Sequence, residues 1–351
     1  MRSVRAACSA GHRAGGHRRP KLPLLRRAPF ALVAGLACAG CGVLHANTSS
    51  VAPPRTLNVV LNGQPSALYA PLYVGAADGA FARGALSVSL SAAGSDAGAL
   101  SALSSGRAQV AIVSEPAVLA ARASGERIVA IGALANGPLE AIISLHKLGS
   151  AKALAGKTVA TDGTQFAAAE VASYLASGGV TPTQVHLVTG QDQSLLSHRA
   201  YALLGRWDLN AVALALARRN PSVVRVESAG VPSYTDLAIV VRVHTARYQG
   251  ALLRAFLQSV GRAEAATRAN PTAAAQVLVR ANPALTLGFE LAALSATQGD
   301  ARAAGAGQPF GYQNPVRWQA FGDWMAAHSL LRTAALAGDT ITDEFLPGQG
   351  E

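Results

Sequence analysis

The sequence predicts an α/β protein built from two lobes, and two observations lead to that prediction. Short apolar runs alternate with longer stretches of helical periodicity, which is the pattern of largely parallel sheets whose strands are joined by helices. The chain has 351 residues, of which 50% are hydrophobic and 14% are charged. At this length, two lobes with helices appended to them are favoured over one continuous lobe.

The first group of predicted strands lies before residue 146. These runs are bounded by Gly, Asp and Asn, and their sequences are TLNVVL, LSVSL (86–90), QVAIV (109–113), IVAIGAL (128–134) and EAIISL (140–145). Among them, the stretch PAVLAARASG predicts a helix, with Pro116 in its first turn and Gly125 as its C-terminal stop.

A second group of strands follows a gap of helical and polar sequence. Its members are KTVA (157–160), VHLV (185–188), YALL (201–204), VVRV (223–226) and then LAIVVRV (237–243), with a predicted helix at FAAAEVASYLAS (166–177). From Tyr248 onward the pattern is mostly helical, and Pro271, Pro283 and Pro315 mark breaks or first turns. In RWQAFGDWM, the spacing of Trp318, Phe321, Trp324 and Met325 predicts a helix face that packs in the core.

The basic residues are concentrated at the N-terminus. Residues 1–40 contain eight Lys or Arg and no acidic residue, whereas the rest of the chain has 22 basic and 19 acidic residues. A nearly balanced body does not have the charge of a nucleic-acid-binding surface, so no nucleic-acid partner is expected.

The apolar run from Pro29 to Gly40 is too short to span a bilayer and suits the hydrophobic region of a signal peptide. Ala39-Gly40-Cys41 resembles the end of a bacterial lipoprotein signal, which implies removal of residues 1–40 and a lipid on Cys41. Residues 41–55 then form a tether that holds an exported body on the periplasmic side of the membrane. A lipid on Cys38 and an ordinary cleaved signal are the alternatives.

Enzyme motifs are missing from the body. The stretch AGKT (155–158) is not a phosphate-binding loop, because Ala151 stands where the motif needs Gly. The body histidines show no HExxH spacing, and no cysteine follows Cys41, so an internal disulfide and a Cys/His pair are excluded there. We therefore predict no catalytic residue, no metal and no cofactor.

Several longer stretches resemble one known superfamily. They occur in the order APLYVGAADGAFARGALSVSL (70–90), ALSSGRAQVAIVSEPAVLAARASG, LAGKTVATDGTQF, GRWDLNA, SAGVPSYTDLAIVV and QPFGYQNPVRWQAFGDWM. Together they resemble the ABC-transporter substrate-binding proteins of the SsuA/pyrimidine-precursor-synthase-like superfamily. GVPSYTDL and RWQAFGDWM are most similar to the ThiY-like branch, which binds thiamin pyrimidine precursors.

The resemblance implies a type II periplasmic-binding-protein fold, in which two α/β lobes enclose a ligand cleft. Two crossovers are expected near 143–147 and 234–239. The first lobe would comprise residues 56–145 and 238–351, and the second lobe residues 146–237.

The resemblance also implies a monomeric solute-binding protein that delivers an aminopyrimidine to an ABC permease and its ATPase. Riboflavin, an alkanesulfonate or taurine are alternative ligands, and a sensor is an alternative role. A pyrimidine-synthase enzyme is less favoured, because the fungal enzymes carry a Cys-rich motif and a histidine near the position of Tyr69.

A cleft for an aminopyrimidine needs aromatic faces and a few polar groups that meet the ring's edge. Loops at strand ends supply such groups in α/β folds. In the family-like loops of this chain, the candidates are Tyr69, Ser114, Glu115, Thr164, Phe166, Trp207, Asp208 and Asn210. Trp207 is the expected stacking residue, and Asn210 stands where the resemblance implies a ligand-binding Glu. Glu115 is either an acceptor for the ligand or a carboxylate favoured by the start of a helix.

Overall fold

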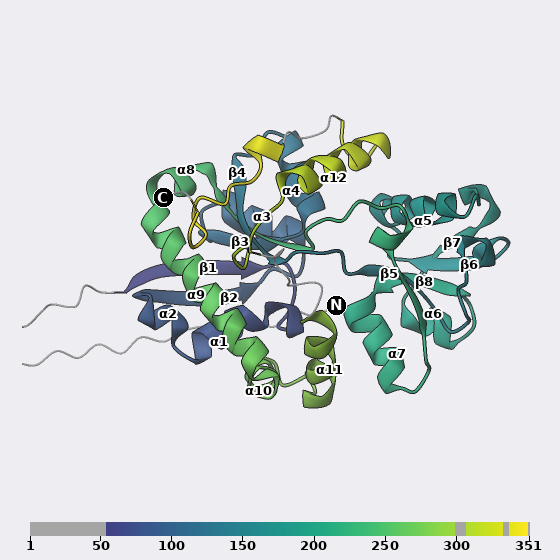
Figure 1. Cartoon of the computed structure of the whole chain (residues 1–351), viewed down its shortest axis with the longest axis horizontal. Helices are drawn as coiled ribbons and strands as arrows, with labels where there is room; N and C mark the ends of the chain where they lie inside the picture. Colours follow the sequence, from purple (N-terminus) through teal and green to yellow (C-terminus); the bar gives the residue numbers. More distant parts are fainter. Residues whose placement is uncertain (1–53, 299–306, 333–336, 350–351) are drawn as a thin grey trace, which may run out of the picture. The chain divides into compact units, whose positions relative to one another are not determined.

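The computed structural model describes residues 54–298, 307–332 and 337–349 (Figure 1). The predicted signal peptide, Cys41 and all but the last two residues of the predicted tether lie outside these ranges. From Ala52 onward the chain forms one compact unit. Within that unit the strands form two separate five-stranded sheets, so the predicted α/β class is confirmed.

The first sheet has the strand order β2-β1-β3-β10-β4. In that order, its strands are Leu86–Ala92, Arg55–Leu61, Val110–Val113, Leu237–Arg242 and Ile128–Ala135. Strands β3 and β4 are buried along their whole length, which is consistent with their continuous apolar sequences. The other members run parallel to one another, and β10 alone is antiparallel to its neighbours within this sheet.

The second sheet repeats this plan with the order β7-β6-β8-β5-β9. Its strands are His186–Thr189, Thr158–Thr161, Ala202–Arg206, Glu140–Ser144 and Ser222–Arg225. Here β5 is the strand that runs antiparallel to its neighbours.

The strand β5 corrects one predicted boundary. Residues 140–145 were assigned to the first lobe, but β5 pairs with β8 and β9 of the second sheet. The chain leaves the first sheet at the end of β4 and enters the second after residues 136–139, a link too short to contain a helix. Two successive apolar runs without a helix between them gave no sequence signal that the sheet changes there.

The antiparallel strands result from where the chain crosses between the sheets. The crossovers, residues 136–139 and 230–236, lead directly into β5 and β10. Each of these strands therefore begins at the edge where the parallel strands of its own sheet end. Loops with polar side chains consequently meet at one edge of each sheet.

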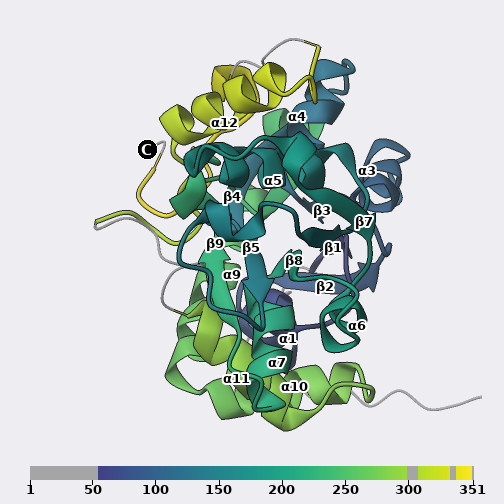
Figure 2. The ribbon, with the colours of Figure 1, turned by 90° about the vertical axis from the view of Figure 1, so that its right-hand side faces the viewer.

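Helices surround the first sheet and form most of the C-terminal part of the chain. They are α1 (Ala70–Ala77), α2 (Ala80–Arg83), α3 (Asp96–Ser104), α4 (Glu115–Ala123), α8 (Val243–Tyr248), α9 (Gly250–Ala269), α10 (Pro271–Ala281), α11 (Leu287–Thr297) and α12 (Pro315–Ala327). Helix α1 packs on α9 and α10, and α11 contacts α7 (Val212–Leu216), a helix that follows β8 of the second sheet (Figure 2). No helix in the described ranges has the length and apolar character needed to cross a membrane.

The second sheet carries another set of helices. They are α5 (Gln165–Ser177), α6 (Asp192–Leu196), α7 (Val212–Leu216) and a single π-helical turn, η4 (Trp207–Ala211). Three-residue and four-residue 3₁₀ turns complete the fold at Ala67–Tyr69, Ala151–Leu154, Pro182–Gln184, Val226–Ala229 and Ala337–Asp339.

Several predicted helix starts are confirmed. Pro116, Pro271 and Pro315 lie in the first turns of α4, α10 and α12. The hydroxyls of Ser114 and Thr164 cap α4 and α5 by accepting hydrogen bonds from the third residue along.

Helix α12 buries the predicted aromatic face. Trp318, Phe321, Trp324 and Met325 are all buried. Trp324 Nε1 donates to Ser173 Oγ on α5 over 3.1 Å, and Phe321 stacks on Tyr234 of the second crossover with 4.5 Å between ring centroids. The C-terminal helix therefore joins elements of the second sheet and the crossover.

One arginine of α12 holds both crossovers. Arg317 Nη2 donates to the carbonyl oxygen of Asn136 over 3.1 Å and to the hydroxyl of Ser233. The Asn136 side chain in turn donates to the carbonyl oxygen of Tyr312 over 2.9 Å. These bonds fix the two links between the sheets to the same C-terminal segment.

Arg317→Met should lower the free energy of unfolding by about 1–3 kcal/mol, because it leaves two hydrogen-bonding groups of the crossovers without their partner. Met retains most of the apolar stem of the side chain. Chemical unfolding of the variant and the wild type measures the difference.

The matched control is Val316→Ala, one residue earlier on the same helix, where the side chain is 74% exposed. This change should stay within about 0.5 kcal/mol of the wild type. Equal stability of Arg317→Met and Val316→Ala would show that Arg317 does not hold the crossovers.

Candidate functional site

A cavity of about 750 Å³ lies between the facing edges of the two sheets. The first sheet contributes Asp96 and Ser114, from the starts of α3 and α4. The second contributes residues that follow β6 and β7 or end β8, together with the first turns of α5. Glu140 from the start of β5, and Tyr234 and Asp236 from the second crossover, also line it. Leu209 and Asn210 of the turn after β8, and Met325 and Leu330 near the C-terminus, are the other contributors.

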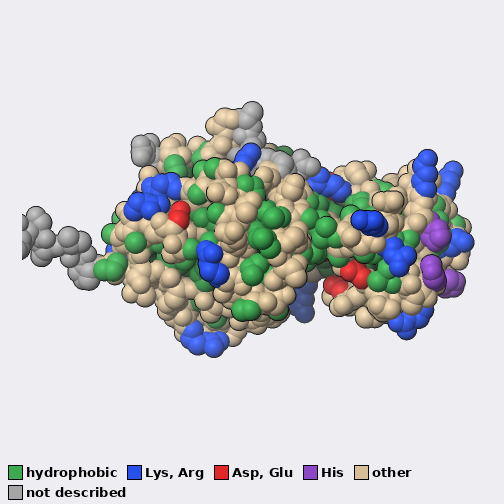
Figure 3. Space-filling model, turned by 90° about the horizontal axis from the view of Figure 1, so that it is seen from below, with side chains coloured by type: hydrophobic (Ala, Val, Ile, Leu, Met, Phe, Trp, Pro, Cys, Tyr) green, Lys and Arg blue, Asp and Glu red, His purple; other side chains and the backbone are tan. Residues whose placement is uncertain are grey.

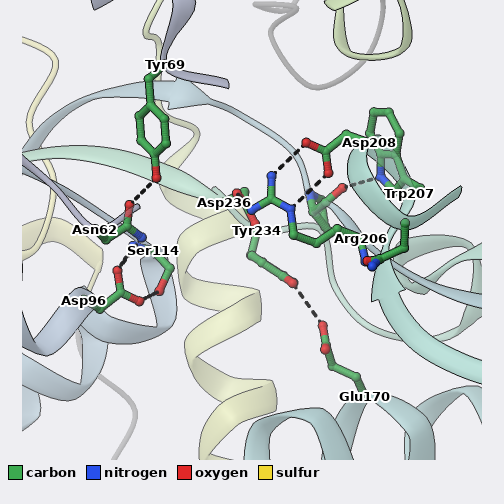
Figure 4. A network of polar contacts seen from close by, with 12 residues as sticks. Asn62, Tyr69, Asp96, Ser114, Glu170, Arg206, Trp207, Asp208, Tyr234 and Asp236 are labelled. Atoms are coloured by element: carbon green, nitrogen blue, oxygen red, sulfur yellow. Dashed lines mark hydrogen bonds and ion pairs between the residues drawn. The ribbon is translucent and has the colours of Figure 1, made fainter. Parts of the chain in front are cut away.

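A chain of hydrogen bonds supports the wall of the first sheet (Figure 4). Tyr69 Oη donates to Asn62 Oδ1, and Asn62 Nδ2 donates to Asp96 Oδ1, each over 2.7 Å. Ser114 donates to the same carboxylate through its backbone N–H and its hydroxyl, over 3.0 and 2.6 Å. Asp96 is thereby held in the cavity wall.

Tyr69 supports this wall from outside the cavity. Its side chain is buried, and burial raises the pKa of its hydroxyl, so the hydroxyl remains a donor. A Cβ on Gly63 would lie 2.6 Å from the Tyr69 hydroxyl oxygen. The tyrosine therefore uses space that only glycine leaves open at position 63.

The wall of the second sheet is organised around Arg206, the last residue of β8. Its Nε and Nη2 donate to the two carboxylate oxygens of Asp208 over 3.0 and 2.8 Å. Its Nη1 lies 3.8 Å from an oxygen of Asp236. The guanidinium is thus occupied by two carboxylates of this chain.

Burial perturbs the acids around Arg206. Loss of solvent raises the pKa of Glu140 to about 8 and that of Asp236 to about 6, although the guanidinium opposes both shifts. Glu140 of β5 lies directly opposite Arg206 of β8 in the sheet. Its side chain is partly exposed and lines the cavity. Glu140 is therefore poised to change protonation near neutral pH.

Glu170 and Tyr234 form a second buried pair. Tyr234 Oη donates to Glu170 Oε1 over 3.0 Å. Burial raises the pKa of Glu170 well above its ordinary value, and the charge of Glu140 raises it further. Beside this pair, Phe166 packs edge-on against Tyr234 with ring centroids 5.8 Å apart, and both rings line the cavity.

The cavity is acidic. Five carboxyl groups line it, from Asp96, Glu140, Asp162, Glu170 and Asp236. Of the described residues that line it, Arg206 is the only cation, and its guanidinium is already paired. No group of three or more His, Cys, Asp or Glu in the described ranges is arranged to hold a metal ion.

The structure brings four of the eight predicted site residues to the cavity. They are Ser114, Thr164, Phe166 and Asn210. Tyr69, Glu115, Trp207 and Asp208 do not line it, and each has another set of contacts. Asp208 is fully buried beneath the guanidinium of Arg206.

Trp207 lies on the other side of the turn from the cavity. Its indole N–H donates to the carbonyl oxygen of Pro138 over 3.1 Å. The guanidinium of Arg225 lies 4.5 Å from the centroid of its ring, a cation–π contact. The indole thus fastens the first crossover to the π-helical turn, and this geometry does not support the predicted stacking.

Asn210 lines the cavity but has its polar atoms occupied. Its Oδ1 accepts from the backbone N–H of Arg206 over 2.6 Å, and its Nδ2 donates to Asp192 Oδ1 over 2.8 Å. These bonds close the π-helical turn and hold Arg206 in place.

Glu115 ties α4 to the second crossover. Its backbone N–H donates to the carbonyl oxygen of Thr235, and the N–H of Thr235 donates to Glu115 Oε2 over 2.6 Å. Burial raises the pKa of this carboxyl to about 8. Glu115 is therefore a structural acceptor at the crossover.

Sequence reasoning missed the residues that give the cavity its charge. Arg206 and Asp236 stand in the family-like stretches GRWDLNA and SAGVPSYTDL. Glu140 begins the apolar run EAIISL, and Glu170 lies inside the helix FAAAEVASYLAS. A single carboxyl within an otherwise uncharged helix such as FAAAEVASYLAS was the available signal for Glu170.

Two solved structures of binding proteins share this architecture. The alkanesulfonate-binding protein SsuA from Xanthomonas axonopodis pv. citri, bound to MOPS, superimposes with a TM-score of 0.61 at 14% identity, covering 83% of this chain and 99% of that one. The periplasmic aliphatic sulphonate binding protein SsuA from Escherichia coli gives 0.66 at 15% identity, with the same coverage. The chain thus has the two-lobed fold of periplasmic binding proteins, as predicted.

The family follows from the sequence itself. Residues 67–274 match the family described as NMT1/THI5 like, and the chain belongs to that family. It is also 26% identical over 302 residues to the formylaminopyrimidine-binding protein of Halalkalibacterium halodurans, a match that covers 82% of this chain and 91% of the relative.

The carboxyl of Glu115 should make stability depend on pH. Its pKa is about 8 in the folded protein against 4.5 ordinarily, so the folded state retains a proton that the unfolded chain loses. Its contribution is therefore most favourable below pH 4.5 and is lost as the pH rises towards 8. Between pH 4.5 and pH 8, the free energy of unfolding should fall by as much as about 5 kcal/mol through this one group.

Glu115→Gln keeps an oxygen acceptor for Thr235 and cannot ionise. Its free energy of unfolding should fall less steeply than that of the wild type between pH 5 and 8, so the two curves converge at low pH. Urea unfolding at a series of pH values measures this, and parallel curves would contradict the assignment.

Proposed function

We propose that this protein is the extracytoplasmic solute-binding component of an ABC importer and that it holds an aminopyrimidine in the cavity between its sheets. The family, the fold and the similarity to a formylaminopyrimidine-binding protein support the proposal. A periplasmic location, an anchor on Cys41, a monomeric state, and a permease with its ATPase as partners belong to the same proposal.

The observation that carries the choice of ligand is the charge of the cavity. Five carboxyls face into it, and the one cation among the described lining residues is paired with Asp208 and Asp236. A sulfonate would find no free cation among the described lining residues to meet its charge. A ligand that presents N–H donors suits these acceptors, which favours an aminopyrimidine over an alkanesulfonate or taurine.

The raised pKa of Glu140 matches the edge of an aminopyrimidine. That edge places an amino donor next to a ring-nitrogen acceptor. A neutral carboxyl offers a carbonyl oxygen and an O–H side by side, so it can accept from the amine and donate to the ring nitrogen. Burial, which raises the pKa of Glu140 to about 8, favours this neutral form at pH 7.

Aromatic contact comes from Phe166 and Tyr234 in this account. Both rings line the cavity, and Phe166 is wedged edge-on against Tyr234, Phe321 and Trp324, at centroid distances of 5.8, 6.2 and 5.9 Å. This packing fixes the orientation of the Phe166 ring while leaving it partly exposed. A flat ligand can pack on it without reordering the wall.

Titration calorimetry with formylaminopyrimidine, riboflavin and taurine tests the ligand class. We expect binding of formylaminopyrimidine and a loss of about tenfold or more in affinity for Glu140→Leu, because both hydrogen-bonding atoms that meet the paired edge are then removed. The control Glu344→Gln changes an exposed carboxyl outside the cavity and should bind like the wild type. Tight binding of taurine with none of the pyrimidine would overturn the choice of ligand.

Two aromatic substitutions separate the predicted stacking residues. Phe166→Leu should weaken formylaminopyrimidine binding about two- to tenfold, because it removes an aromatic face from the cavity. Trp207→Phe should leave affinity within about twofold, since the indole is engaged by Pro138 and Arg225 outside the cavity. The opposite order in calorimetry would assign the stacking to Trp207.

A further inference from the structure

A second, smaller cavity lies at the opposite end of the second sheet from the ligand cavity. It has a volume of about 250 Å³, and the side chains at its wall include His146, Lys157, His198, Arg199 and Tyr201. Thr158 begins β6, and Tyr201 immediately precedes β8. The ligand cavity lies at the other end of the same strands, where Asp162 follows β6 and Arg206 ends β8.

The two ends of this sheet have opposite charge. The ligand cavity is rich in carboxyls, whereas the wall of the second cavity contains two cations and two histidines and no acidic residue. In the space-filling view, Lys, Arg and His side chains gather at the right-hand end of the molecule, without acidic side chains among them (Figure 3). The strand β6 separates the two ends by only about 10 Å.

The cations at this wall are not neutralised within the described part of the chain. The ion pairs among the described residues involve Arg83, Arg206 and Arg225, and none involves Lys157 or Arg199. Arg199 uses its Nε to donate to Ser197 Oγ over 3.1 Å, and no bond within the described chain engages its terminal nitrogens. Both side chains are exposed and able to meet a ligand.

Tyr201 gives the cavity a fixed aromatic surface. The imidazole of His146 stacks on its ring, with centroids 4.6 Å apart and planes 7° apart. The ammonium nitrogen of Lys157 lies 5.3 Å from the ring centroid. The backbone of Tyr201 is bonded to Thr158 and Ser144, so the ring is anchored to β6 and β5.

We propose that this cavity binds a phosphate-class oxyanion, either free in solution or as the headgroup of an anionic lipid. The wall offers charged N–H donors from Lys157 and Arg199, with further donors from the two imidazoles, and a guanidinium and an ammonium are the groups that recognise phosphate oxygens. The volume accommodates a single phosphate group but is small for a drug-sized ligand. This site is separate from the ligand cavity and does not depend on its occupant.

The experiment has two arms, each with the full-length protein. In the first arm, inorganic phosphate is titrated while the backbone amide signals of residues 156–158 and 198–201 are followed by NMR. In the second arm, flotation compares vesicles of phosphatidylglycerol with vesicles of phosphatidylcholine. The variant is Lys157→Gln with Arg199→Gln, and Lys152→Gln is the control, since Lys152 is an exposed lysine near this end of the sheet that does not line the cavity.

Each cation removed should weaken binding about two- to fivefold, as expected of exposed charge pairs. Lys157→Arg keeps the charge and should retain binding, which guards against a folding defect as the cause of any loss. If the double variant loses phosphate binding in the first arm, the ligand is a free anion. If it loses only binding to phosphatidylglycerol vesicles, the ligand is a lipid headgroup. Every variant has the same N-terminal segment, so that segment cannot produce a difference between them.

Two results would overturn the proposal. One is the absence of any binding by the wild type in both arms. The other is binding that falls equally in the double variant and in Lys152→Gln, which would indicate non-specific attraction to a basic surface.

Discussion

The pairing of one half-buried guanidinium with two carboxylates is the constraint on which the candidate site depends. Arg206 ends β8, where it meets Asp208 in two hydrogen bonds and Asp236 across the boundary between the sheets. Removing these groups from water is costly, and the cost is offset only while the charges remain together. The arrangement therefore fixes the second crossover to the second sheet. Because Asp208 and Asp236 neutralise Arg206, its guanidinium is not available to an anionic ligand. The other carboxyls of the lining, Glu140 above all, then determine which ligand the cavity accepts.

The topology explains why these groups meet. Each crossover leads directly into an antiparallel strand, so the starts of β5 and β10 lie beside the ends of the parallel strands of their sheets. Glu140 and Asp236 are placed by the crossovers, and Arg206 by the end of a strand. Glu115 and Arg317 hold the crossovers from the first-sheet side and from α12. The positions of the cavity's charges and the links between its two walls are thus fixed by the same segments.

Much of this fold could be predicted from the sequence, because buried strands and capped helix starts leave local patterns. Ser114 and Thr164 were found as cavity residues since each follows an apolar strand and precedes a helix. Glu140 was not found because a strand residue gives no sign of which sheet it joins. The position of Trp207 directly after a strand does not show to which side of the following turn its indole points. That direction is set by the π-helical turn, which Asn210 closes, and it brings the indole to Pro138. Long-range contacts of this kind have no signature in a single sequence.

A crystal structure of the protein with formylaminopyrimidine is the most direct test of the central claim. We expect the ligand to lie between the two sheets, with its amino group within hydrogen-bonding distance of Glu140 and its ring against Phe166. Arg206 should remain paired with Asp208. A ligand that displaces Asp208 and binds the guanidinium, or one that lies outside the cavity, would contradict the claim that the acidic lining selects the ligand.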